Sequence, residues 1–270
     1  MVSYAKRMKA MAYTANVVSN LFGAMTNPDI ISFGGGAPAK EALPIDILRH
    51  LTDEVILKDK RGVEALQYGP IGGTKDMKEV IVNELLAPKG VTCTTDNVMV
   101  VAGGLEGINL VCQVYIDPGD VILVESPTFV HSVEIFEMFE AKCIGVDMDD
   151  DGVKMDDLEA KIQAYHPKMI YVIPTFQNPS GRTLCLERRK KVAELAAKYD
   201  VLVLEDDPYR DIRYSGEDLP PIKSFDTTGH VVHLISFSKT VSPGLRVGAA
   251  IGDASLLRPM TVAKQGMDTH

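Results

Sequence analysis

Residues 230–252 read HVVHLISFSKTVSPGLRVGAAIG, and this stretch determines the fold that we expect. The apolar runs at its two ends, HVVHLI and RVGAAIG, have the length of strands buried in a sheet. The ten residues between them, SFSKTVSPGL, leave no room for a helix. We therefore expect one strand of this pair to run antiparallel to the other, because parallel neighbours need a longer crossover.

Five further apolar runs precede this pair and alternate with segments of helical period. The runs are NVMVVA (97–102), DVILVE (120–125), KCIGVD (142–147), KMIYVIP (168–174) and VLVLED (201–206). The helical segments are 105–115, 129–141, 155–165 and 186–199, with two more patterns upstream at 44–60 and 74–86. Most runs are continuously apolar, which is typical of strands covered on both faces. The alternation predicts an α/β fold, with a mostly parallel sheet covered by helices.

The composition narrows the classes of function. The chain has 270 residues, 46% of them hydrophobic, and a formal net charge of −9. An acidic chain without a basic block is poorly suited to bind nucleic acid through its phosphates. No apolar run is long enough to span a bilayer, and the N-terminus lacks the pattern of a signal peptide. We therefore expect no nucleic-acid or membrane partner.

The four cysteines, Cys93, Cys112, Cys143 and Cys185, are far apart and have no metal-ligand spacing. Each lies in or beside an apolar segment, so we expect buried, reduced thiols. That state is typical of a cytoplasmic protein.

The residues that follow the strands carry the chemistry, because ligands bind beyond the carboxyl ends of strands in open α/β sheets. After the first run, Gly103 and Gly104 lead into a helix. They form either a tight turn or a place where the backbone approaches a phosphate at the helix N-terminus. After the second run, Phe129 either fills the core or lies against a planar ring.

The next two strand ends carry polar side chains. Asn178 lies in TFQNPSG, where it either forms a turn or donates a hydrogen bond to an oxyanion. Asp206 and Asp207 end a buried strand, so one of them needs a cationic or protonated partner. Successive strand residues point to opposite faces, so the two acids cannot share one role. Tyr209 could reach the same ligand as Asp206.

The loop between the last two runs places Lys239 among hydroxyl residues, with Arg246 seven residues later. A lysine there is either a solvated charge or an amine that forms a Schiff base with a carbonyl compound, once its pKa is lowered. The asparagine, the aspartate with its tyrosine, the lysine and the arginine occur in this order at successive strand ends. Together they predict a site for pyridoxal 5′-phosphate (PLP), which needs an amine, a carboxylate and a phosphate-binding cation.

The sequence resembles the class I and II aminotransferases, which have fold type I of the PLP enzymes. It is most similar to the branch of aminoadipate, kynurenine and aromatic amino-acid aminotransferases. The resemblance covers nearly the whole chain, through ISFGGGAP, LQYGPIGG, VVAGGLEG, ESPTF, PTFQNPSGRT, LEDDPYRDIRY and SFSKTVSPGLRVG. It implies a three-layer α/β sandwich around a mostly parallel, mixed sheet of seven strands. It also implies an arm and substrate-pocket segment at residues 1–45 and a PLP-binding large domain at 46–270.

The resemblance also implies roles for individual residues. It makes Lys239, Asp206 and Tyr209 catalytic, with Lys239 binding PLP covalently and Asp206 pairing with the pyridine nitrogen. Cofactor contacts would further come from Gly103, Gly104, Leu105, Phe129, Asn178, Ser236, Ser238 and Arg246. Gly35, Gly36 and Asn178 would contact the substrate. Tyr68 resembles the tyrosine that reaches the cofactor of the neighbouring subunit, which implies a homodimer with composite sites.

Two departures from the family are visible. Many relatives carry Ser-Gln where this chain has Gly104 and Leu105, so side-chain donors are replaced by backbone donors there. Relatives also continue past the final KQGMDTH into a small domain, whose arginine grips the substrate carboxylate. Arg182 and Arg210 lie close to site motifs, and we expect them to form surface salt bridges instead.

The resemblance implies a transaminase that uses an L-amino acid and a 2-oxo acid, with 2-oxoglutarate as the expected acceptor. A PLP lyase on the same scaffold and an inactive, truncated PLP-binding module remain alternatives. A regulator with an aminotransferase-like ligand domain is disfavoured, since the N-terminal part has no room for a DNA-binding domain. The sequence does not identify the amino donor.

Overall fold

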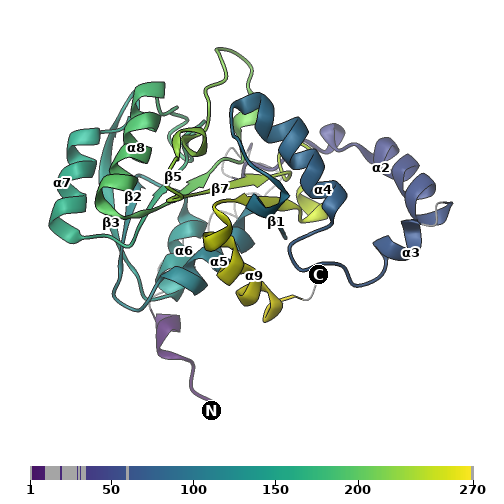
Figure 1. Ribbon diagram of the computed structural model, residues 1–270, viewed down its shortest axis with the longest axis horizontal. Coiled ribbons are helices and arrows are strands. Elements are labelled where there is room, and N and C mark those ends of the chain that lie inside the picture. The colour runs from purple at the N-terminus through teal and green to yellow at the C-terminus, as the bar shows by residue number, and fades with distance from the viewer. Residues whose placement is uncertain are drawn as a thin grey trace.

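The structure is a computed structural model that describes residues 2–9, 19, 29, 31, 35–58 and 61–268. Within them, eight strands form one sheet in the order β1-β8-β7-β6-β5-β2-β3-β4 (Figure 1). The strands are β1 Val98–Val101, β2 Val121–Ser126, β3 Lys142–Asp149, β4 Gly152–Val153, β5 Met169–Val172, β6 Leu202–Asp206, β7 Val231–Ser236 and β8 Gly248–Ile251. All seven predicted runs form strands. The eighth, β4, has only two residues and returns beside β3, too short to leave a sequence pattern.

The strand directions confirm the expected antiparallel return. β3, β2, β5, β6 and β7 are parallel neighbours, whereas β8 is antiparallel to both β7 and β1. β1 therefore points the same way as β7. Consequently the carboxyl ends of β1, β2, β5, β6 and β7 meet at one edge of the sheet, where ligands bind in folds of this kind.

The predicted helical segments also form helices. The α-helices are α2 Ile45–Leu51, α3 Arg61–Ala65, α4 Lys75–Val80, α5 Gly104–Tyr115, α6 Val130–Met138, α7 Met155–Tyr165, α8 Leu186–Tyr199 and α9 Ala254–Gln265. Two π-helical segments, η3 Thr52–Leu57 and η4 Ile81–Leu86, continue α2 and α4. Single 3₁₀ turns occur at η1 Lys6–Lys9, η2 Lys40–Ala42, η5 Ala87–Lys89, η6 Thr95–Asn97, η7 Arg210–Ile212, η8 Ile222–Phe225 and η9 Pro243–Leu245.

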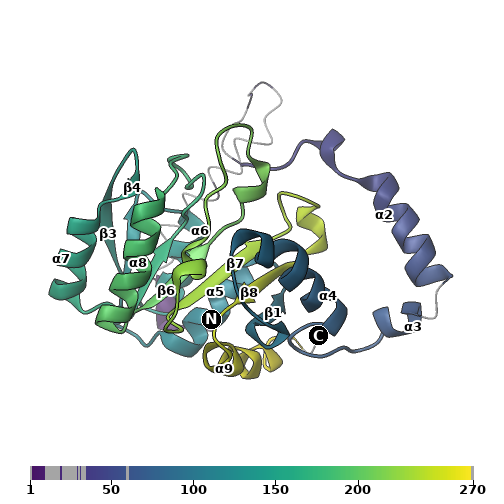
Figure 2. The ribbon, with the colours of Figure 1, turned by 45° about the horizontal axis from the view of Figure 1, so that its top comes forward.

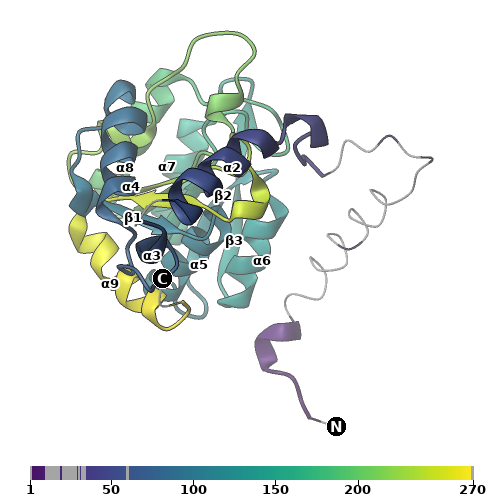
Figure 3. The same ribbon diagram turned by 90° about the vertical axis from the view of Figure 1, so that its right-hand side faces the viewer.

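Helices cover both faces of the sheet, so the fold is the predicted three-layer sandwich. α5, α6 and α9 lie on one face, and α4, α7 and α8 lie on the other (Figure 1 and Figure 3). Alternate strand residues enter the two layers. Tyr171 and Leu204 pack under α5 and α6, whereas Ile170 and Val203 pack under α7 and α8. The continuous apolar runs exist because each strand is buried from both sides.

The segment that holds α2 and α3 lies to one side of the sheet (Figure 2). It exposes several apolar side chains, namely Ile45, Ile47, Leu51, Val63 and Leu66. An apolar surface of this kind is typical of a face that another protein surface covers. Of the predicted arm at residues 1–45, only 2–9, 19, 29, 31 and 35–45 lie within the described part of the chain.

No described helix has the length and apolar character needed to cross a bilayer. The four cysteines are free thiols. Only Cys112 is fully buried, whereas Cys93, Cys143 and Cys185 are half-buried, which corrects the expectation of complete burial.

Candidate active site

A cavity of about 710 Å³ opens at the carboxyl edge of the sheet. Most of the predicted site residues line it: Gly35, Gly36, Gly104, Leu105, Phe129, Asn178, Asp206, Tyr209, Ser236, Ser238, Lys239 and Arg246. They come from the last residues of β6 and β7, from the start of α5, from the loops after β2, β5, β6 and β7, and from the segment before α2. The topology therefore brings together groups that are more than two hundred residues apart in the sequence.

Asp206 is the acid at the end of β6 that faces this cavity. Its side chain lies on the same face as Leu204, and its Oδ2 accepts a 2.8 Å hydrogen bond from the Tyr171 hydroxyl. A Cβ atom added to Gly104 would lie 3.8 Å from Asp206 Oδ1, so this second oxygen is directed toward the start of α5. Burial raises the pKa of Asp206 to about 6, and the hydrogen bond from Tyr171 opposes that rise. A cation in the cavity would complete the pairing of this carboxylate.

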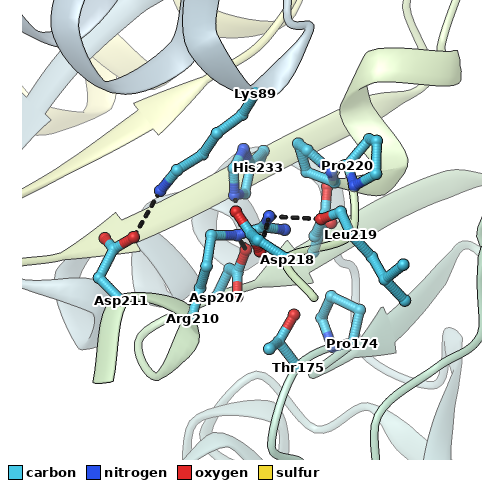
Figure 4. A network of polar contacts seen from close by, with 12 residues as sticks. Lys89, Pro174, Thr175, Asp207, Arg210, Asp211, Asp218, Leu219, Pro220 and His233 are labelled. Carbon is cyan, nitrogen blue, oxygen red and sulfur yellow. Dashed lines mark hydrogen bonds and ion pairs between the residues drawn. The ribbon is translucent and has the colours of Figure 1, made fainter. Parts of the chain in front are cut away.

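Asp207 faces the opposite side and has its own cation. Its Oδ2 accepts a 2.6 Å hydrogen bond from Arg210 Nε, and His233 Nε2 lies 3.5 Å from the same oxygen. Arg210 also donates to Asp218, so the guanidinium lies between two carboxylates (Figure 4). Burial alone would raise the pKa of Asp207, but the adjacent His233 and Arg210 outweigh it and lower the pKa below its ordinary value.

The expected cationic partner for one of the two acids is thus confirmed, and it belongs to Asp207. The expectation that Arg210 lies in a surface salt bridge is wrong, since Arg210 is only 3% exposed. Its ion pairs with Asp207 and Asp218 compensate its charge in this buried position. Arg182 does form a surface pair, with 3.5 Å between its Nη2 and Asp150 Oδ1.

Asn178 and Tyr209 meet in the cavity although they follow different strands. Asn178 Nδ2 donates a 2.9 Å hydrogen bond to the Tyr209 hydroxyl. Burial raises the pKa of Tyr209, so the phenol stays protonated at neutral pH. The phenol oxygen accepts from Asn178 and keeps its own proton for a ligand acceptor.

Lys239 brings its amine to the same cavity from the loop after β7. Its Nζ donates a 2.8 Å hydrogen bond to the backbone carbonyl of Gly36, which joins the loop to the segment before α2. Burial lowers the pKa of Lys239, which increases the fraction of neutral, nucleophilic amine. A reactive amine therefore explains the surroundings of Lys239 better than a solvated charge does.

The opposite end of the cavity is suited to an anion. Arg246 Nη2 donates a 2.9 Å hydrogen bond to the Ala102 carbonyl, which holds the guanidinium beside the N-terminus of α5. The first N–H groups of a helix have no partner within it, so Gly104 and Leu105 can donate to a phosphate. Ser236 and Ser238 add two hydroxyls, whose Oγ atoms lie 3.1 Å apart.

Two predicted residues do not line the cavity. Gly103 lies just behind it, against Arg246, and there its role is to leave room for the guanidinium. Tyr68 is 78% exposed and is not among the lining residues. Any contact of Tyr68 with a cofactor would therefore have to be made in a second copy of the chain.

Three residues with a clear relation to the cavity were not predicted from the sequence. Thr128 lines it, and its buried Oγ1 has no hydrogen-bond partner within the described residues. His131 also lines it, 2.9 Å from Glu134 Oε2 and in edge contact with the Phe129 ring. Both flank Phe129, which was their only signal in the sequence. Tyr171 gave none, because a tyrosine within an apolar strand looks like core.

The cavity fits PLP on features of the described residues. It contains an amine with a lowered pKa and a buried carboxylate whose second oxygen faces inward. It also contains the orphaned hydroxyl of Thr128, and an arginine beside a helix N-terminus. These are the groups that an aldehyde, a pyridine nitrogen and a phosphate need.

Comparison with known proteins shows the family of this chain. The chain belongs to the class I and II aminotransferases, whose family pattern it matches over residues 28–267. It is 36% identical over 265 residues to aromatic-amino-acid aminotransferase 1 of Thermococcus litoralis, covering 96% of this chain and 63% of that protein. It is 30% identical over 259 residues to 2-aminoadipate transaminase of Thermus thermophilus, covering 95% and 63%.

The fold agrees as well. The crystal structure of the kynurenine aminotransferase of Pyrococcus horikoshii, which holds PMP, superposes with a TM-score of 0.91 at 36% identity. The match covers 98% of this chain and 66% of that one. The resemblance drawn from the sequence motifs is therefore confirmed for the family and the fold type. The chain spans 63% of the length of the two curated relatives.

Proposed function

We propose that this chain is the cofactor-binding part of a PLP-dependent aminotransferase. The observation that carries the proposal is the cavity shared by the Lys239 amine and the Asp206 carboxylate, with Arg246 at its other end. When bound, PLP supplies an aldehyde and a ring that withdraws electrons from the α-carbon of an amino acid. The groups of this chain would bind it, orient it and move protons around it.

Lys239 would act at the reacting atoms. The neutral amine that its lowered pKa favours would hold PLP through the aldehyde carbon. Nζ would also be placed to hold or move a proton at the α-carbon of an amino acid. The bond from Nζ to the Gly36 carbonyl directs the amine across the cavity toward the segment that we assign to the substrate pocket, with Gly35 and Gly36.

The remaining lining residues would hold the cofactor. Asp206 would pair with the pyridine nitrogen and keep it protonated, while Asn178 and Tyr209 would bind the phenolate oxygen of the ring. Phe129 would lie against the ring. The phosphate would be bound by Ser236, Ser238 and Arg246 and by the backbone of Gly104 and Leu105, with Gly103 behind them.

The substrates we propose are an L-amino acid and a 2-oxo acid, with 2-oxoglutarate as acceptor. The relatives are named for aromatic amino acids, 2-aminoadipate and kynurenine, which supports a substrate with an extended side chain. The cofactor cradle would serve a PLP lyase equally well, so the lyase remains the second candidate. Transfer of the amino group to 2-oxoglutarate distinguishes the two.

We further propose residues 1–45 as arm and substrate-pocket segment and 46–270 as large domain, completed by a small domain of the kind that the longer relatives have. The exposed apolar residues of α2 and α3 support a homodimer. In that dimer, Tyr68 of one copy would reach the cofactor of the other. The four free cysteines support a reducing, cytoplasmic environment.

The test is to add PLP to the purified protein and record visible absorbance, then to reduce with borohydride and map the labelled peptide. We expect one label, on Lys239. Lys239→Ala should lose the label and keep weak PLP binding, whereas Lys198→Ala, on the distant α8, should behave as wild type. A label on another lysine, or no absorbance change in wild type, would contradict the proposal.

A further inference from the structure

Tyr171 connects the core of the sheet to the carboxylate in the cavity. It lies in the middle of the domain on β5, is fully buried, and has Leu204 of β6 as its strand neighbour. Asp206 is two residues beyond Leu204 and lies on the same face. The phenol therefore reaches along the sheet, and its hydroxyl donates the 2.8 Å hydrogen bond to Asp206 Oδ2.

Packing alone does not require this hydroxyl. The Tyr171 ring makes an edge contact with Phe136 at 5.3 Å between centroids, inside a cluster of apolar side chains. A phenylalanine would fill the same space, and a buried hydroxyl is unfavourable unless it is hydrogen-bonded. We therefore infer that the hydroxyl of Tyr171 serves its hydrogen-bond acceptor, Asp206.

The hydrogen bond distinguishes the two oxygens of Asp206. Oδ2 is held by Tyr171, whereas Oδ1 is directed toward Gly104 at the cavity wall. Burial raises the pKa of Tyr171 well above its ordinary value, so the phenol stays protonated at neutral pH and can donate to Asp206. Ser132 is a polar neighbour of the phenol, and its Oγ donates to the Phe129 carbonyl at 2.6 Å. The same small network thus contacts two residues that face the predicted ring.

We propose that Tyr171 is a positioning residue that fixes Asp206 Oδ2, so that Oδ1 meets the pyridine nitrogen of PLP. The proposal rests on the proposed function, since it assumes that PLP occupies the cavity. Tyr171 touches neither cofactor nor substrate in this arrangement and acts only through Asp206. Four further ionisable groups interact with Asp206: Asp207 and His233, in the network on the opposite face of the sheet, Glu125 at the end of β2, and Tyr209 in the cavity.

The decisive variant is Tyr171→Phe, with Tyr115→Phe as its matched control. Tyr115 also donates a 2.8 Å hydrogen bond, to the Leu256 carbonyl between α5 and α9, away from the cavity. Hydrogen bonds to charged groups are among the stronger ones, so Tyr171→Phe should weaken PLP binding about tenfold. Tyr115→Phe should bind PLP as wild type does. With ¹⁵N-labelled PLP, the pyridine nitrogen signal should move toward its unprotonated position in Tyr171→Phe alone.

A second readout needs no cofactor. In the PLP-free protein, ¹³C NMR of the aspartate carboxyls should show a higher pKa for Asp206 in Tyr171→Phe, because a donor to the charged form is lost. If that variant does not fold, 3,5-difluorotyrosine at position 171 keeps the hydroxyl and makes it a stronger donor. The pKa of Asp206 should then fall.

The outcomes separate the two proposals. If wild type does not bind PLP, the proposed function and the role of Tyr171 both fail. If wild type binds PLP and Tyr171→Phe matches it in affinity and in the nitrogen signal, only the role of Tyr171 is refuted. An Asp206 pKa that is unchanged by either substitution would refute it as well.

Discussion

Gly103 offers a sharp test of how the anion end of the cavity is built. Its φ is 88° and its ψ 168°, a region that is essentially restricted to glycine. A Cβ atom at this position would lie 2.3 Å from Arg246 Nη2 and 2.9 Å from its Cζ. Gly103→Ala therefore combines backbone strain with a clash against the side chain that we assign to the phosphate.

The magnitude follows from these two effects. Backbone strain of this kind costs about 1–3 kcal/mol, which should appear directly as a loss of unfolding free energy. The atoms that clash belong to the far end of a flexible side chain, so the guanidinium will move while the backbone stays. Arg246 then leaves the Ala102 carbonyl and the phosphate position. Loss of one charged hydrogen bond, at about 1.5–3 kcal/mol, should weaken PLP binding at least about tenfold.

Gly104→Ala is the matched control, one residue away. Gly104 does not have a positive φ, and the nearest atom to its added Cβ is Asp206 Oδ1 at 3.8 Å. Alanine in the first turn of α5 should even stabilise the helix, by about 0.5–1 kcal/mol relative to glycine. Urea unfolding and PLP titration of both variants decide the matter. If Gly103→Ala bound PLP as tightly as Gly104→Ala does, our account of the arginine pocket would be refuted.

Four further predictions concern the two acids, the pH dependence of stability, the oligomer and the length of the chain. Asp207→Asn should cost up to about 3–5 kcal/mol of stability, because it leaves the buried Arg210 with Asp218 alone as its charge partner. Asp206→Asn should mainly weaken PLP binding. Equal effects of the two substitutions in urea unfolding and in PLP titration would contradict the division of roles. His233 and Arg210 lower the pKa of Asp207 in the folded protein. The free energy of unfolding that the ionised Asp207 contributes is therefore fully present above the ordinary carboxyl pKa, and it is lost as the pH falls through the lowered pKa of the folded state. Acid unfolding curves measure this loss. Mixing Tyr68→Phe with Lys239→Ala chains should restore activity in hybrid dimers, and no recovery despite proven subunit exchange would argue against composite sites. This chain should bind PLP better than it transaminates, and a version fused to the part of the Thermococcus litoralis relative that lies beyond the match should gain activity. Equal turnover of both would show that the grip on the substrate carboxylate lies within these residues.

The fold could be predicted because burial on both faces makes each strand a continuous apolar run. That signal requires a run of several residues. β4 was not predicted because its two residues, Gly152 and Val153, are too few to form a pattern. The site could be predicted for a related reason. In a parallel sheet the loops after the strands meet at one edge. Polar residues that follow apolar runs are therefore expected to lie near one another in the fold, even when they are far apart in the sequence.

What could not be predicted depends on side chains that meet inside the protein. Alternation along β6 gave Asp206 and Asp207 opposite faces, but the sequence does not state which partner each would find. Arg210 was expected at the surface because arginines usually are. It is buried because two carboxylates, from Asp207 and Asp218, compensate its charge.

These two networks also explain why adjacent acids can differ so much in pKa. Asp206 has a neutral donor, Tyr171, so burial dominates and its pKa rises to about 6. Asp207 has a full charge at 2.6 Å, so its pKa falls although it is equally buried. A cationic ligand in the cavity would give Asp206 what Arg210 gives Asp207. Of the two carboxylates, Asp206 is therefore the one that lacks a cationic partner among the described residues, and a protonated pyridine ring has the positive charge that it needs.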